Sequence, residues 1–98
     1  MSAQVLQVAE VEALSPLVTR FRFVHPEGQP LPLFSGGAHV VVEMPDGEVL
    51  RRNAYSLISD PLDGSGYEIA VRRDEAGRGG SRFMHAEVAV GDLLRVGD

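Results

Sequence analysis

The chain has 98 residues, of which 44% are hydrophobic, and it contains 11 Gly and 6 Pro, as expected for one globular domain with a single core and many turns. Its formal net charge of -5 argues against a nucleic-acid partner, because a phosphate backbone requires a basic surface. Because the chain has no Cys, it has no disulfide and no thiolate metal site. It has no apolar run of about 18 residues, and its N-terminus lacks the basic and apolar regions of a signal peptide. We therefore expect a cytoplasmic protein outside the membrane.

Alternation of apolar and polar side chains predicts six strands. In chain order, they cover residues 5–11, 19–23, 39–44, 48–59, 67–73 and 93–96. Phe21 and Phe23 are expected to face a core together, as are Val40 and Val42. A Pro-Asp-Gly turn at residues 45–47 makes the fourth strand return antiparallel to the third.

One short helix is predicted over residues 81–88, with Ser81 as its N-cap and with Met84 and Val88 on its apolar side. Six strands joined by turns, together with one short helix, favour an all-β fold: a closed antiparallel barrel of Greek-key type. The sequence stops on a turn signal directly after the last predicted strand. We therefore expect residues 1–98 to be one barrel domain of a longer polypeptide.

All nine basic residues are Arg, and they are unevenly distributed. Residues 51–82 contain six Arg and five acidic residues, a net charge of +1, whereas the remainder carries a net charge of -6. A locally basic region in an acidic domain suits a small anion such as a phosphorylated cofactor. The alternative is that solvated Arg side chains cluster there without a ligand.

A glycine-rich segment, Gly77-Arg78-Gly79-Gly80-Ser81, opens the predicted helix. The absence of side chains at Gly79 and Gly80 lets backbone N–H groups approach an anion, and the helix N-terminus adds partial positive charge. Ser81 can cap the helix or bind the anion, and an Arg stands on either side. The spacing matches neither the dinucleotide-binding fingerprint nor the Walker loop, so an ordinary loop and helix cap is the alternative.

The segment from Arg51 to Leu57 carries the second group of candidate residues. Its two faces alternate, with Arg51, Asn53, Tyr55 and Leu57 on one and Arg52, Ala54 and Ser56 on the other. Side chains from both faces line one ligand only if it lies across the end or edge of the strand. A flat aromatic cofactor meets this condition: Tyr55 would pack on its ring, while Ser56 and backbone groups bond to its edge. The alternative is a core Tyr55 beside a turn-facing Ser56.

Taken together, these segments resemble those of a known family. The similar stretches are Tyr55-Ser56-Leu57, Asp60-Pro61, Ile69-Ala70-Val71-Arg72-Arg73-Asp74 and Gly77-Arg78-Gly79-Gly80-Ser81. Their order is similar to that in the flavin-binding domain of the phthalate dioxygenase reductase and vanillate demethylase reductase family, whose pattern carnitine monooxygenase reductase subunits share. The resemblance extends from Val5 to Val96 and implies a six-stranded barrel of the ferredoxin reductase flavin-binding type.

The resemblance also implies a flavin site. Its cofactor would be FMN, with FAD as the alternative, and the cofactor-binding residues would be Arg52, Asn53, Ala54, Tyr55, Ser56, Ala70, Val71, Arg72, Gly79, Gly80 and Ser81. Tyr55 and Ser56 would contact the isoalloxazine ring, with Ser56 near its reactive N5 edge. Residues 70–72 would contact the flavin mainly through their backbone, and residues 79–81 would hold the phosphate.

One position departs from the family pattern. The family commonly has Arg two positions before the Tyr, where this chain has Asn53. Asn donates hydrogen bonds but carries no charge. Arg51 or Arg52 would therefore supply the cation, and alternation places Arg51 on the Tyr55 face. The choice between FMN and FAD stays open at this point.

In longer members of the family, a nicotinamide-binding domain and a plant-type iron–sulfur domain accompany the barrel. The resemblance therefore implies an oxidoreductase that passes electrons from NAD(P)H through flavin to a 2Fe-2S centre serving an oxygenase, with this domain inactive as a reductase by itself. No catalytic side chain or metal site is predicted, since the three His are on different elements. The alternative function is a cofactor-free barrel used as a binding or scaffold module.

Overall fold

The computed structural model describes residues 3–33, 39–60, 62–74 and 79–97. Within these ranges the elements are, in chain order, β1 (Gln4–Ala13), β2 (Val18–Val24), β3 (His39–Asp46), β4 (Val49–Ser56), β5 (Tyr67–Arg72), α1 (Gly80–Glu87) and β6 (Leu93–Gly97). The all-β fold with one short helix is therefore confirmed. None of the described residues belongs to a helix with the length and apolar character needed to cross a membrane.

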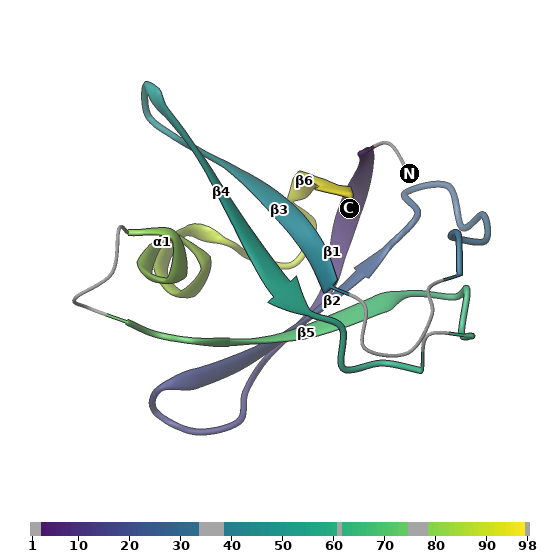
Figure 1. Cartoon of the computed structure of the whole chain (residues 1–98), viewed down its shortest axis with the longest axis horizontal. Coiled ribbons are helices and arrows are strands. Elements are labelled where there is room, and N and C mark those ends of the chain that lie inside the picture. Colours follow the sequence, from purple (N-terminus) through teal and green to yellow (C-terminus); the bar gives the residue numbers. More distant parts are fainter. Residues whose placement is uncertain (1–2, 34–38, 61, 75–78, 98) are drawn as a thin grey trace.

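The six strands form one antiparallel sheet in the order β4-β3-β6-β1-β2-β5. The edge strands β4 and β5 curl toward each other, and we call the line between them the seam (Figure 1). At one end of the seam, Leu57 and Ile69 form a bridge, and the Ile58 N–H donates a 2.8 Å hydrogen bond to the Glu68 carbonyl. At the other end β4 and β5 diverge, and α1 lies between them in contact with β3, β4 and β5.

The core confirms the predicted strand faces. Phe21, Phe23, Val40 and Val42 are fully buried, because period-2 alternation turns them to the inner side of the curled sheet. Met84 of α1 joins the same core and is equally buried. Burying a side chain of this size contributes roughly 1.5–3 kcal/mol, so apolar packing alone already holds α1 against the sheet.

The turn between β3 and β4 is shorter than predicted. β3 continues through Pro45 and Asp46, and Asp46 pairs with Val49, so only Gly47 and Glu48 form the turn. Gly47 has a φ of 61°. A two-residue hairpin turn requires a positive φ at its first position, which Gly adopts without strain. The left-handed Gly therefore shortens the turn and lengthens β3.

The start of α1 also differs from the prediction. The helix begins at Gly80, and its N-cap is Gly79, which has a φ of 98° and makes no side-chain cap. The Gly79 carbonyl accepts the N–H of Phe83 at 2.9 Å. Ser81 is therefore not the N-cap: it lies in the first turn, and its hydroxyl accepts the N–H of Asp74 at 2.9 Å. Because the left-handed Gly79 makes the reversal into the helix, the serine side chain is free to bond with the end of β5.

Candidate functional site

β4 presents one half-buried and one exposed face, as alternation predicts. The half-buried side chains are those of Arg51, Asn53, Tyr55 and Leu57, and the exposed ones are those of Arg52, Ala54 and Ser56. Tyr55 packs against the core, and α1 contacts β4, so the half-buried face is the one toward α1. Ser56 is the last residue of β4, directly before the bridge at Leu57. It therefore lies where the seam begins to open.

The glycine pair before α1 packs directly against this inner face. A Cβ atom added at Gly80 would lie 2.1 Å from Asn53 Nδ2, and one added at Gly79 would lie 2.9 Å from Arg51 Cζ. A side chain at either position would have to displace the Arg51 guanidinium or the Asn53 amide, and the positive φ of Gly79 disfavours one further. The structure thus brings together the two segments that the sequence places more than twenty residues apart.

Asn53 lies between the glycine pair and Tyr55. Its Nδ2 donates a 3.1 Å hydrogen bond to the Tyr55 hydroxyl, and its amide contacts Gly80. Burial raises the pKa of Tyr55, and the Asn53 hydrogen bond opposes this by a smaller amount, so the phenol remains protonated at neutral pH. The Tyr55 side chain, the Asn53 amide and the glycine backbone therefore form one continuous surface.

A pocket of 250 Å³ opens beside this contact. It is lined by Val49, Leu50, Arg51, Arg52, Asn53 and Gly80. Guanidinium groups, an amide and the first N–H groups of a helix are all hydrogen-bond donors, and the helix N-terminus carries partial positive charge. A pocket with this set of donors is suited to an anion such as a phosphate group.

The two arginines of this pocket have different surroundings. Arg51 is 26% exposed, its Nε donates to Asp46 Oδ2 at 2.9 Å, and its guanidinium lies over Gly79. Arg52 is 64% exposed, and its Nη2 lies 3.5 Å from Glu43 Oε1. Water screens a half-buried cation less than an exposed one. Of the two cations that the sequence offers in place of the family arginine, Arg51 is therefore the better placed.

The edge of β5 forms the opposite side of the open seam. The Glu68 N–H bonds to the Ser59 hydroxyl at 3.1 Å, and the Glu68 carbonyl accepts from Ile58, so the backbone of Glu68 faces β4. Backbone groups of an antiparallel strand alternate in direction. Those of Ala70 and Arg72 therefore face the seam as well.

Val71 and Ser81 face other partners. The Val71 side chain is fully buried, and its carbonyl oxygen lies 2.7 Å from His85 Nε2. The Ser81 hydroxyl accepts the Asp74 N–H. The predicted contacts of Val71 and Ser81 with a flavin stay predictions. Gly77 and Arg78 of the glycine segment lie outside the described residues.

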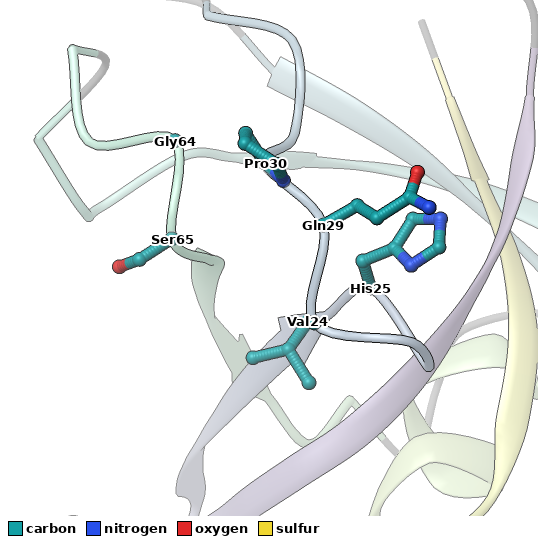
Figure 2. Close-up of a pocket in the computed structure, with 7 residues that line it drawn as sticks. Val24, His25, Gln29, Pro30, Gly64 and Ser65 are labelled. Atoms are coloured by element: carbon teal, nitrogen blue, oxygen red, sulfur yellow. The ribbon is translucent and has the colours of Figure 1, made fainter.

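A larger pocket, of 440 Å³, lies at a different place in the fold (Figure 2). It is lined by Val24, His25, Gly28, Gln29, Pro30, Gly64 and Ser65, none of which is a predicted site residue. His25 Nδ1 accepts the Glu27 N–H at 3.0 Å. The Ser65 hydroxyl donates to Asp63 Oδ1 at 2.6 Å and accepts from Arg22 Nη2 at 2.9 Å. The lining residues of this pocket include no Arg, whereas those of the smaller pocket include two, so this pocket lacks the cationic character of the smaller one.

Sequence reasoning did not single out three residues of this region. Val49 and Leu50 line the smaller pocket from the tip of the β3–β4 hairpin, and His85 bonds to β5. The four-residue spacing of Ser81 and His85 is the signal that they share a helix face. Within the described part of the chain, no group of three or more His, Asp or Glu side chains is placed to hold a metal ion.

Comparison with known proteins shows what the chain is similar to, although no family model matches it. It is 54% identical over 91 residues to the carnitine monooxygenase reductase subunit of Escherichia coli (strain K12), covering 93% of this chain and 28% of that protein. It is 44% identical over 91 residues to the phthalate 4,5-dioxygenase oxygenase reductase subunit of Pseudomonas putida, covering 93% of this chain and 27% of that protein.

The fold is similar to that of a solved phthalate dioxygenase reductase, described as a modular structure for electron transfer from pyridine nucleotides to [2Fe-2S]. The two structures superpose with a TM-score of 0.90 and 36% identity, covering 97% of this chain and 29% of that one. The chain therefore spans less than a third of the length of the relatives that it matches.

Proposed function

Because the chain belongs to the family of oxygenase reductase components that includes phthalate dioxygenase reductase, and has its flavin-binding reductase fold, we propose that it is the FMN-binding domain of such a component. In the complete polypeptide, a nicotinamide-binding domain and an iron–sulfur domain would accompany it. Electrons would pass from NAD(P)H to the flavin, then singly to a 2Fe-2S centre, and from there to an oxygenase.

The contact between Asn53 and Gly80 is the observation that carries this proposal. It joins the strand segment to the glycine segment at the open end of the seam, and Asn53 also holds the hydroxyl of Tyr55. A flavin phosphate requires cationic and backbone donors on one side of the site, and the ring requires a flat, partly apolar surface beside them. The residues present meet both requirements.

The phosphate would lie in the 250 Å³ pocket. There, Arg51 would supply the cation, and the N–H groups of the first turn of α1 would donate hydrogen bonds. Gly79 and Gly80 would let the backbone approach the anion closely, since neither carries a side chain. Asp46 holds the Arg51 guanidinium through Nε, which fixes its direction before the ligand arrives.

The isoalloxazine ring would lie across the open seam. Tyr55, held by Asn53, would pack against the ring, and Ser56 would donate its hydroxyl to the N5 edge. The seam-facing backbone groups of Ala70 and Arg72 would bond to the polar edge of the ring. When bound, the flavin supplies the redox chemistry, and the protein contributes binding, orientation and electrostatic environment.

A titration of the purified chain with FMN, FAD and riboflavin, followed by quenching of flavin fluorescence, tests the proposal. We expect saturable binding of FMN, weaker binding of FAD, and much weaker binding of riboflavin, because riboflavin lacks the phosphate. Tighter binding of FAD than of FMN would overturn the choice of cofactor. Equal affinity for FMN and riboflavin would overturn the phosphate site, and no saturable binding of any flavin would overturn the assignment of the chain as a flavin domain.

A further inference from the structure

His85 connects α1 to β5 by a hydrogen bond outside the site described above. It lies in the last turn of the helix, where Nε2 is 2.7 Å from the Val71 carbonyl oxygen and Nδ1 is 3.4 Å from Thr19 Oγ1. A carbonyl only accepts hydrogen bonds, so Nε2 is the donor, and Nδ1 then accepts from the Thr19 hydroxyl. One tautomer therefore satisfies both contacts.

Ser81 makes a second connection one helical turn earlier. Its hydroxyl accepts the Asp74 N–H at 2.9 Å, and residues four apart on a helix lie on the same side. Ser81 and His85 thus fasten one side of α1 to the β5 chain at Asp74 and Val71. The helix and the strand run in opposite directions along this contact.

We propose that His85 is a positioning residue for the flavin, and the proposal rests on the function proposed above. The N-terminus of α1 carries the glycine pair of the phosphate pocket. Val71 lies between Ala70 and Arg72, whose backbone groups border the ring. The His85–Val71 bond therefore fixes the distance between the part of the protein that holds the phosphate and the part that holds the ring.

Apolar packing keeps α1 on the core without fixing its position along β5. Met84 and Val88 are buried, and van der Waals contacts between such side chains are not directional. A hydrogen bond of 2.7 Å between a ring nitrogen and a backbone carbonyl is directional. Loss of the imidazole is thus expected to leave the domain folded but to loosen the register between α1 and β5.

The test compares the affinities of FMN and riboflavin in three variants: His85→Leu, His85→Gln and Glu87→Gln. In His85→Leu, FMN affinity is expected to fall about tenfold, the effect of losing one or two partly buried hydrogen bonds, while riboflavin affinity stays the same. The ratio of the two affinities therefore falls. In His85→Gln, the side-chain amide N–H can still donate to Val71, so the ratio is expected to recover to within about threefold of the wild type.

The exposed Glu87, the last residue of the same helix, provides the control, and Glu87→Gln is expected to change neither affinity. Equal losses for FMN and riboflavin in His85→Leu would contradict the proposal, because a general loosening of the fold affects both ligands. An unchanged ratio in His85→Leu would also contradict it. Failure of the wild-type chain to bind any flavin would instead overturn the proposed function, so the two failures are distinguishable.

Discussion

Two of the pockets in the described part of the domain differ more in their chemistry than in their size. The pocket at residues 24–30 and 64–65 has a volume of 440 Å³, against 250 Å³ for the pocket at residues 49–53 and Gly80. In the larger one, His25 Nδ1 accepts the N–H of Glu27, and the Ser65 hydroxyl bonds to Asp63 and to Arg22 of β2. The smaller one collects guanidinium, amide and helix N-terminal donors. The comparison teaches that the charge and hydrogen-bonding groups of its lining, and not its volume, make a pocket suited to an anion.

The arginines of the domain also differ in their surroundings. Arg20 contacts Glu10, Glu12 and Glu68, and Arg22 also bonds to Glu68. These ion pairs tie the outer face of β1, β2 and β5 together and lower the pKa of Glu10. Such cations serve the fold and are not available to a ligand.

Arg51 is also ion-paired, but it lies beside α1. Its Nε bonds to Asp46, while the rest of its guanidinium lies over the glycine that begins α1. One residue type therefore has a structural role on the outer face of β2 and, we propose, a ligand-binding role beside α1.

The substitution Gly80→Asp is expected to have the largest effect. The new side chain would begin 2.1 Å from Asn53 Nδ2 and would place a carboxylate where the phosphate is proposed to bind. FMN affinity is expected to fall by at least about 100-fold, or ~2.7 kcal/mol. Fluorescence titration gives the affinity, and circular dichroism checks that the barrel remains folded.

A substitution in the larger pocket serves as the control for Gly80→Asp. His25→Ala changes a pocket of greater volume but, in this proposal, of no cofactor-binding role, so FMN affinity is expected to stay the same. Undiminished FMN binding in Gly80→Asp, or a loss in His25→Ala comparable to that in Gly80→Asp, would break the distinction between the two pockets.

The pair Arg51→Gln and Arg52→Gln separates the two neighbouring arginines. Removing a charged partner from a hydrogen bond costs about 1.5–3 kcal/mol, so Arg51→Gln is expected to weaken FMN binding by roughly 10- to 100-fold. Arg52→Gln removes an exposed charge and is expected to change FMN affinity by less than about threefold. Riboflavin affinity, measured in parallel, should respond to neither change. The reverse order of the two losses would assign the phosphate contact to Arg52.

Tyr55 is expected to contribute to the ring and not to the phosphate. Tyr55→Ala removes an aromatic contact worth about 0.5–1.5 kcal/mol beyond its buried area, so FMN and riboflavin affinities are expected to fall together, by about tenfold. Tyr55→Phe keeps the ring and loses only the bond from Asn53, so its affinities should stay near those of the wild type. A loss confined to FMN would show that Tyr55 acts through the phosphate pocket instead.

Ser56→Ala is expected to give the smallest effect. The exposed hydroxyl contributes little binding energy, but one hydrogen bond of about 1 kcal/mol to the N5 edge shifts a two-electron potential by ~20 mV. A redox titration of the FMN-loaded chain measures this shift, with Ala54→Ser on the same face of β4 as a control. An unchanged potential in Ser56→Ala would argue against a contact between this hydroxyl and N5.

Local pattern was sufficient for most of the fold. Alternation alone predicted that Phe21, Phe23, Val40 and Val42 are buried, because the direction of a strand side chain depends only on its position. The errors at the β3–β4 turn and at the start of α1 both involve a glycine in the left-handed conformation. The predicted fourth strand was also too long at its end, because β4 stops at Ser56 and not at residue 59. Pro45 and Ser81 are typical turn and cap residues, but the positive φ of Gly47 and of Gly79 decided where the chain reverses.

The candidate site likewise has features that the sequence predicted and features that it did not. The sequence by itself determined its composition: a strand with Asn53 and Tyr55 on one face, a glycine pair able to approach an anion, and a local excess of Arg. Only the tertiary structure decided which face of β4 meets the glycine pair, and hence that Arg51 and not Arg52 lies over it. It also decided that His85 reaches Val71. Alternation orders the side chains within each element, whereas these contacts depend on how α1 packs into the open seam, and that packing is set by the curling of the whole sheet.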